Sequence, residues 1–274
     1  MENYVILGGF KMSTVSKISK KADQPKGGYL KPSQFETTII DDGIKLNEVE
    51  NISPSLIGMA VEYLTRLEIE ESAVDAFIIS LKGAYSASRN GFTDALEKAE
   101  FLLLNIKKGL DDQSIINACK MTTFDVWYRN IDAALIAKGS PDYINPDSST
   151  IQNIRTMVMR SMQLWKEYGP VIETGFTFKK EAFTYTVTDG EGDFLTKDTI
   201  WDYKVSKNKL TTQQTLQLLM YWIIGQHDGS PKYKNIKKLG IFNPRLNIVY
   251  TLNVSQIPAE IIEAVEKDVI CYEK

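Results

Sequence analysis

The sequence predicts an α/β protein: a mixed central β-sheet flanked by helices, with a mainly helical insert. Alternating β-branched and aromatic segments lie mostly late in the chain, and helical periodicity dominates residues 69–168. A chain of 274 residues, 43% of them hydrophobic, can bury a full core. We expect a flexible N-terminal arm at 1–28 and a single domain at 29–274, with the insert at about 69–168.

The expected elements follow in chain order. Residues 37–46 predict a small β-hairpin around an Asp-Gly turn. Residues 53–67 predict a helix, because Ser53 can cap it and Pro54 suits its first turn. Further helices are expected at 92–107, 112–121, 150–168, from 211 or 212 to 224 with Gly225 as the stop, and from 258 to about 269, and further strands at 200–205, 236–242 and 247–254.

The segment 200–205 alternates apolar or aromatic residues with charged ones. As a strand it would place Trp201 and Tyr203 on one face and Asp202 and Lys204 on the other. The side chains of Asp202 and Lys204 would therefore point into the same region. The other possibility is a solvated strand face with a weak ion pair.

A second carboxylate is expected beside Asp202. Asp193 follows a glycine-interrupted stretch, and residues 196–199 are typical of a turn between two strands. A hairpin would bring Asp193 next to Asp202. Neighbouring carboxylates repel unless a proton or a cation lies between them, and Mg²⁺ prefers such oxygen ligands. The pair therefore favours a divalent-metal site, in which Lys204 would orient a water or offset transition-state charge.

The helix after this hairpin carries polar residues on a largely apolar body. Gln213, Gln217 and Tyr221 lie four residues apart and share one stripe. They can face the site, or they can satisfy backbone groups at the sheet edge. The expected packing face consists of Leu216, Leu219, Met220 and Ile223.

The ordered set of Gly190 with Asp193, then Asp202-Tyr203-Lys204, then Gln217 and Tyr221 resembles the PD-(D/E)XK nucleases. Within this superfamily it is most similar to the RecB-like and phage-type exonuclease branch. The resemblance implies a restriction-endonuclease-like core and a Mg²⁺ or Mn²⁺ ion held by Asp193, Asp202 and the carbonyl of Tyr203. It also implies a catalytic Lys204, with Gln217 and Tyr221 shaping the site or contacting DNA.

The same resemblance extends to the helix at 53–67. Gly58 and Glu62 match a Gly-x-x-x-Glu core, which implies that Glu62 is a further metal ligand. The alternative is an exposed glutamate on an amphipathic helix. A four-cysteine iron–sulfur cluster is excluded, because the chain has only Cys119 and Cys271.

Charge is distributed unevenly along the chain. The net charge is −3, yet residues 197–245 hold nine basic and three acidic residues, an excess expected to surround the site. Lys207 and Lys209, in the loop before the glutamine helix, are the candidates for phosphate contacts, with ordinary solubility as the alternative. Arg155 and Arg160 are further candidates to face DNA, although helix-surface arginines more often only contact solvent.

These patterns predict a divalent-metal-dependent deoxyribonuclease that hydrolyses phosphodiester bonds. The resemblance favours a DNA exonuclease in recombination or repair. An endonuclease on the same fold and a non-catalytic nucleic-acid-binding protein remain alternatives. The expected partners are DNA and either a second copy of the chain or a recombination protein. No apolar run approaches the ~20 residues that span a membrane, and two distant cysteines favour the cytoplasm.

Overall fold

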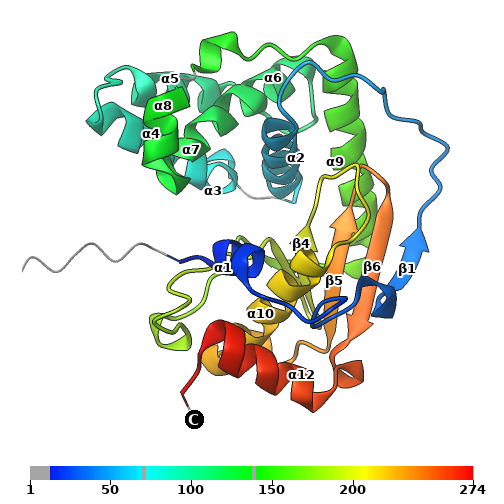
Figure 1. The fold of residues 1–274 in the computed structure, drawn as a ribbon. Coiled ribbons are helices and arrows are strands. Elements are labelled where there is room, and N and C mark those ends of the chain that lie inside the picture. The colour runs from blue at the N-terminus through cyan, green and yellow to red at the C-terminus, as the bar shows by residue number, and fades with distance from the viewer. Residues whose placement is uncertain (1–12, 70–71, 138–139, 274) are drawn as a thin grey trace, which may run out of the picture.

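The computed structural model describes residues 13–69, 72–137 and 140–273. Within these residues, six strands form one mixed sheet in the order β1-β6-β5-β4-β3-β2 (Figure 1). The neighbours are antiparallel except for β4 and β5, which run parallel. The strands are β1 (Glu36–Ile39), β2 (Val171–Thr174), β3 (Phe194–Thr196), β4 (Thr199–Tyr203), β5 (Lys238–Asn243) and β6 (Ile248–Asn253). The predicted α/β class with a mixed sheet is confirmed.

The parallel pair requires a crossover connection, which α10 (Thr212–Asp228) supplies. Thr211 caps this helix by accepting a hydrogen bond from the backbone of Gln214. The expected stop at Gly225 is wrong, because α10 continues to a left-handed cap at Gly229. Gly225 instead allows a close approach: a Cβ there would lie 2.9 Å from Cδ1 of Tyr233.

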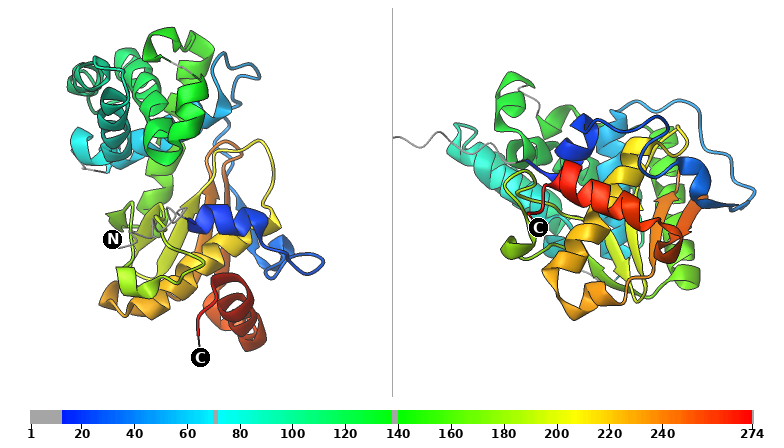
Figure 2. Two further views of the ribbon diagram at one scale, coloured as in Figure 1. Left: turned by 60° about the vertical axis from the view of Figure 1, so that its left-hand side comes forward. Right: turned by 60° about the horizontal axis from the view of Figure 1, so that its bottom comes forward.

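Helices cover both faces of the sheet (Figures 1 and 2). One face packs Ile200 and Ile241 against α10 and against the closing helix, in which α12 (Ala259–Ala264) continues as a π-helical turn (Val265–Ile270). The other face packs Trp201 against α9 (Ser148–Tyr168). The helix predicted at 53–67 is α2 (Pro54–Glu68), which lies beside α9.

The expected flexible arm at 1–28 is folded where it is described. Residues Val15–Lys21 form α1, whose N-terminus is capped by Thr14. The backbone N–H of Val15 donates to the carbonyl of Asp189 at 3.0 Å, and the Val15 side chain is fully buried against the α10 side of the sheet. Residues 13–28 are therefore part of the folded body, while residues 1–12 lie outside the described residues.

Within the region predicted as a helical insert, the helices from Ala73 to Ala137 form a group above the sheet, here called the helical lobe (Figure 1), whereas α9 packs on the sheet itself. The helix expected at 112–121 has these bounds, because Asp111 caps it. A buried carboxylate, Asp125, ties the lobe to α2 by accepting hydrogen bonds from Tyr63 at 2.5 Å and Ser80 at 2.6 Å. The lobe comprises α3 (Ala73–Ala76), α4 (Ile78–Arg89), α5 (Ala95–Leu104), α6 (Asp112–Met121), α7 (Asp125–Arg129) and α8 (Ile131–Ala137).

The hairpin expected at 37–46 does not form. Strand β1 pairs with β6, and residues 40–53, here called the strap, run from β1 to α2 without forming a second strand. The Asp-Gly turn exists locally, since Gly43 has a φ of 69° and its N–H donates to Asp41.

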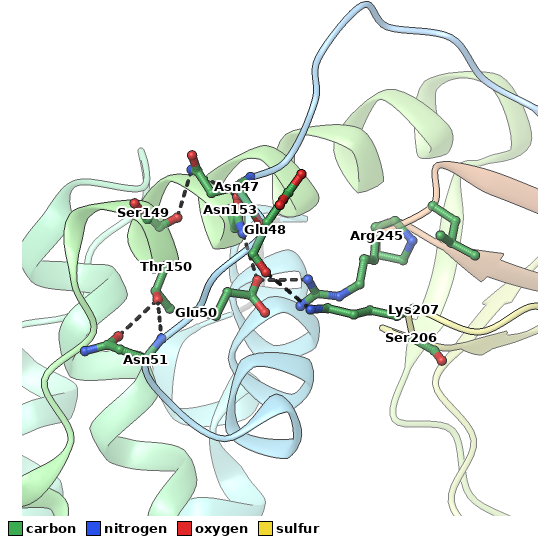
Figure 3. A network of polar contacts seen from close by, with 12 residues as sticks. Asn47, Glu48, Glu50, Asn51, Ser149, Thr150, Asn153, Ser206, Lys207 and Arg245 are labelled. Carbon is green, nitrogen blue, oxygen red and sulfur yellow. Dashed lines mark hydrogen bonds and ion pairs between the residues drawn. The ribbon is translucent and has the colours of Figure 1, made fainter.

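Polar side chains anchor the strap to α9 and to the β5–β6 turn, as Figure 3 shows for its second half. Asn153 accepts a hydrogen bond from the backbone of Asn47, and Glu50 forms a buried ion pair with Arg245 at 2.8 Å. The strap is therefore a fixed part of the fold.

Candidate active site

The hairpin of β3 and β4 brings the two predicted carboxylates together. Phe194 pairs with Trp201 across the hairpin, which places Asp193 opposite the next position, Asp202. Oδ2 of Asp193 accepts a hydrogen bond from the backbone N–H of Tyr203 at 2.6 Å. The predicted juxtaposition of Asp193 and Asp202 is confirmed.

The two faces of β4 also follow the predicted alternation. Trp201 and Tyr203 belong to the core on the α2 and α9 side, and the Tyr203 hydroxyl bonds to the hydroxyl of Ser161. On the opposite face, Nζ of Lys204 donates to Oδ1 of Asp202 at 2.8 Å. The main chain of Tyr203 therefore contacts Asp193, while burial and the charges of Glu62 and Asp193 raise the pKa of its hydroxyl on the other face.

Asp202 is the most deeply buried acid of the group, with 1% of its surface exposed. Its second oxygen, Oδ2, has no hydrogen-bond partner among the described residues. Burial raises the pKa of Asp202 to about 7; Lys204 opposes this shift and Asp193 adds to it. A buried carboxylate oxygen without a donor is costly, and a bound cation would satisfy it.

Glu62 of α2 belongs to the same group of charges. Burial raises its pKa to about 7, and the neighbouring carboxylate of Asp193 adds to this, while Arg66 opposes it. The structure therefore does not place Glu62 on an exposed helix face. Asp193 is the neighbour that the two other acids share, because its charge raises the pKa of both Glu62 and Asp202.

These residues fit a magnesium ion better than a closed metal cage. In the described parts of the chain, no three His, Cys, Asp or Glu residues are arranged as a ready-made metal site. Magnesium, however, keeps several waters and needs only one or two carboxylates plus substrate phosphate. The unpartnered Oδ2 of Asp202 beside Asp193 is compatible with that kind of binding.

Lys204 is held in its charged form. Burial acts to lower the pKa of its ammonium group, but Asp202, Asp193 and Glu62 outweigh this effect and raise it. About a quarter of the Lys204 side chain remains exposed. Lys204 therefore offers a permanent positive charge at the edge of the carboxylate group.

Gln217 and Tyr221 of α10 bond to each other. Nε2 of Gln217 donates to the Tyr221 hydroxyl at 3.0 Å, and both side chains are buried. Burial, followed by the charges of Asp202 and Asp193, raises the pKa of Tyr221. The pair thus lies on the Asp202 side of the sheet, within electrostatic reach of both acids.

Gly190, the glycine of the first motif, makes room for the packing around Tyr221. A Cβ at Gly190 would lie 2.8 Å from Val15 and 3.6 Å from the Tyr221 ring. On its other side, Tyr221 contacts the rings of Phe176 and Phe178. Gly190 therefore allows α1 and α10 to approach the loop that carries Asp193.

Arg66 and Glu191 are charged neighbours of the site that were not predicted from the sequence, as is Arg129, whose charge also acts on Glu62. Nη2 of Arg66 lies 2.6 Å from Oε1 of Glu62, and Nη1 lies 3.6 Å from Glu191. The four-residue spacing of Glu62 and Arg66 was a usable signal, since such pairs meet on a helix. The spatial partnership with Glu191 has no counterpart in the sequence pattern.

The basic excess does not surround the site as predicted. Lys238 begins β5 opposite Thr199, so Lys197, Lys237 and Lys238 lie at the end of β4 away from Asp202. Two other bases are paired, Lys232 with Glu173 and Arg245 with Glu50. Fewer of the predicted basic residues therefore lie near the site than the sequence suggests.

Two exposed lysines remain near the carboxyl end of β4. Lys207 and Lys209 both follow Lys204 in the loop to α10. Nζ of Lys207 donates to the carbonyl of Glu48 in the strap at 3.4 Å.

Neither arginine of α9 is a free surface cation. Arg160 is buried and binds both oxygens of Asp42, at 2.6 and 2.9 Å, together with three backbone carbonyls. The hypothesis that Arg160 faces DNA is wrong, because it anchors the strap. Arg155 pairs with Asp112 and with the carbonyl of Leu110 in the helical lobe.

Comparison with protein-family models, curated proteins and solved structures finds no match to this chain. Among the described helices, none has the length and apolar character needed to cross a membrane.

Proposed function

We propose that this protein is a divalent-metal-dependent nuclease that hydrolyses phosphodiester bonds in DNA. The unpartnered, buried Oδ2 of Asp202 carries the proposal, since Asp202 lies beside Asp193, whose charge also acts on Glu62, while Oδ1 is bonded to Lys204. A buried carboxylate oxygen without a partner is costly, and a divalent cation held here would offset that cost and attract a substrate phosphate.

Each residue has a distinct proposed role. Asp193, Asp202, Glu62 and the carbonyl of Tyr203 would hold Mg²⁺ or Mn²⁺. When bound, such an ion polarises the scissile phosphate and lowers the pKa of an attacking water. Lys204 would donate to a phosphate oxygen and offset the charge that develops there.

The neighbouring residues would shape and bind the substrate. The buried pair of Gln217 and Tyr221 forms a wall on the α10 side. Lys207 and Lys209 are the proposed phosphate contacts in the adjacent loop, because they are exposed and follow β4 directly.

The finer identity of the enzyme rests on the motif resemblance. We propose a restriction-endonuclease-like core and an exonuclease that acts in recombination or repair. An endonuclease with the same residues is the alternative, because end selection depends on channel shape and assembly rather than on the carboxylates.

Incubation with end-labelled linear DNA and with a closed circle tests the proposal, in Mg²⁺, Mn²⁺ or EDTA. We expect metal-dependent degradation of linear DNA, reduced at least about 100-fold in Asp202→Asn and in Lys204→Ala. Matched controls are Asp132→Asn, on an exposed position of the helical lobe, and Lys197→Ala, at the far end of the hairpin. Both should retain full activity.

The alternatives give different results in the same assay. Cutting of the circle favours an endonuclease. Metal-independent binding of DNA without cleavage favours a nucleic-acid-binding protein. Absence of cleavage of DNA and RNA with either metal, in protein shown to be folded, contradicts the nuclease proposal.

A further inference from the structure

We propose that Arg66 is a positioning residue that fixes the carboxylate of Glu62 at the metal site. This inference rests on the proposed function. Arg66 is 4% exposed, and Nη2 lies 2.6 Å from Oε1 of Glu62, one turn earlier in α2. A buried guanidinium at this distance restricts the rotation of the carboxylate.

The contacts leave one oxygen of Glu62 available. Arg66 engages Oε1, and no donor among the described residues reaches Oε2. The second guanidinium nitrogen, Nη1, lies 3.6 Å from Glu191, two residues before Asp193. Arg66 therefore links α2 to the segment that carries Asp193, while Oε2 of Glu62 stays free to bind a cation.

Arg66 has few contacts besides these two carboxylates. Its Nε is buried and has no hydrogen-bond partner within the described chain, and its guanidinium carbon lies 5.5 Å from the centre of the Tyr63 ring. The position of the guanidinium is thus determined mainly by Glu62 and Glu191. In turn, the position of Glu62 depends on Arg66.

The environment of Gly175 is a second observation: the guanidinium of Arg66 occupies the space that a side chain at position 175 would need. It has a φ of 55°, and a Cβ at this position would lie 2.8 Å from Nη1 of Arg66 and 3.0 Å from Oε1 of Glu191. The N–H of Gly175 also donates to the carbonyl of Asp193 at 2.8 Å. One glycine therefore both admits Arg66 and holds the Asp193 segment.

Loss of the Arg66 side chain would open further space beside Glu62, next to an existing cavity. Arg66 and Glu191 border a cavity of about 210 Å³, which Asp75, Ile78, Thr174 and Gly175 also line. Without the guanidinium, Arg129, whose charge has a smaller effect on Glu62, would be left to oppose the repulsion from Asp193, and the carboxylate of Glu62 would turn away from Asp193. Residues that orient metal ligands typically contribute about 10- to 100-fold to metal affinity.

Calorimetric titration of the metal-free protein with Mn²⁺ tests this role without reference to activity. We expect Arg66→Met to weaken Mn²⁺ binding about 10- to 100-fold. Arg66→Lys keeps the charge but not the planar fork, so it should fall between Arg66→Met and wild type. Arg89→Met, at an exposed arginine of α4, is the matched control and should bind as wild type.

Further variants test whether Arg66 acts through Glu62. If it does, adding Arg66→Met to Glu62→Gln weakens Mn²⁺ binding no further than Glu62→Gln alone. Gly175→Ala should weaken binding in the same direction as Arg66→Met, because its methyl group displaces the guanidinium. Circular dichroism confirms that each variant is folded.

The proposal and the function on which it rests fail in different ways. If Asp202→Asn abolishes Mn²⁺ binding but Arg66→Met and Arg66→Lys bind as wild type, the positioning role is wrong and the metal site stands. The positioning role is also wrong if Arg66→Met weakens Mn²⁺ binding by the same factor in the Glu62→Gln background as it does in the wild-type protein. If the wild-type protein does not bind Mn²⁺, both proposals fail.

Discussion

Among single residues, Asp202 has the strongest expected effect on pH dependence. Its folded-state pKa is raised to about 7, against ~3.9 in an unfolded chain. The folded state then holds a proton that the unfolded state has released. Its stabilising contribution is therefore complete below about pH 4 and is lost as the pH rises through about 7, by at most about 1.4 kcal/mol per pH unit.

An asparagine at position 202 does not titrate, so the Asp202→Asn variant should not lose stability over this pH range. In EDTA, we expect the free energy of unfolding of the variant to increase relative to wild type between pH 5 and pH 7, and the difference to level off above pH 7. Urea unfolding at a series of pH values measures this. Asp132→Asn should follow the wild-type curve, and a constant difference between Asp202→Asn and wild type would contradict the raised pKa.

The Gln217–Tyr221 hydrogen bond gives a second test at this scale. Tyr221→Phe leaves the buried amide of Gln217 without its acceptor and should cost about 1–3 kcal/mol of stability. Replacing both partners, in Gln217→Met with Tyr221→Phe, should cost much less than the sum of the single variants. Denaturant unfolding of wild type, the two single variants and the double variant measures the coupling energy between the two residues. If the stability losses of the single variants add up to that of the double variant, the hydrogen bond does not contribute.

The sequence predicts some of these residues and not others for a physical reason. Asp202 and Lys204 were predictable because strand alternation alone decides which face they share. For Arg66, the sequence shows only its four-residue spacing from Glu62, because its second partner, Glu191, approaches it only in the folded chain.

At the level of elements, the strap depends on Arg160. Arg160→Met removes a buried guanidinium bonded to Asp42 and to three carbonyls, and should cost about 3 kcal/mol. Trypsin should also cleave the strap faster, at Lys45, because its first half loses its anchor. Proteolysis and thermal unfolding measure the two effects.

Arg155→Met is the matched control on the same helix. Its partner Asp112 is largely exposed, so this pair should contribute less than about 1 kcal/mol. Equal losses in the two variants would contradict the anchoring role of Arg160.

Element prediction succeeded where the signal was local. The helix at 112–121 was predictable because its cap, Asp111, is adjacent in the sequence. The strap was mistaken for a hairpin because an Asp-Gly turn looks the same whether or not a second strand follows. Which strand pairs with β1 is decided by residues 248–253, far from the turn.

For the whole molecule, the described part of the N-terminal region is predicted to contribute to stability. Val15→Ala removes two buried methyl groups from the core on the α10 side and should cost about 2 kcal/mol. Lys20→Ala, on an exposed position of α1, should have little effect. Thermal unfolding compares them, and equal melting temperatures for Val15→Ala and wild type would restore the flexible-arm interpretation.

The composition of this region explains why the sequence suggested a mobile arm. Lysine and serine dominate residues 13–21, in which Val15 and Ile18 are the only apolar residues. Its burial depends on contacts with Asp189 and α10, which no local pattern reveals.

The pairing of β1 with β6 has a consequence for the order in which the protein can fold. Glu36 lies opposite Thr251, roughly 200 residues later in the chain, so this contact must await late closure of a very long loop. During synthesis, β1 leaves the ribosome long before its partner exists. The β3–β4 hairpin closes only a short loop. We therefore expect Asp193 and Asp202 to come together before the sheet is complete.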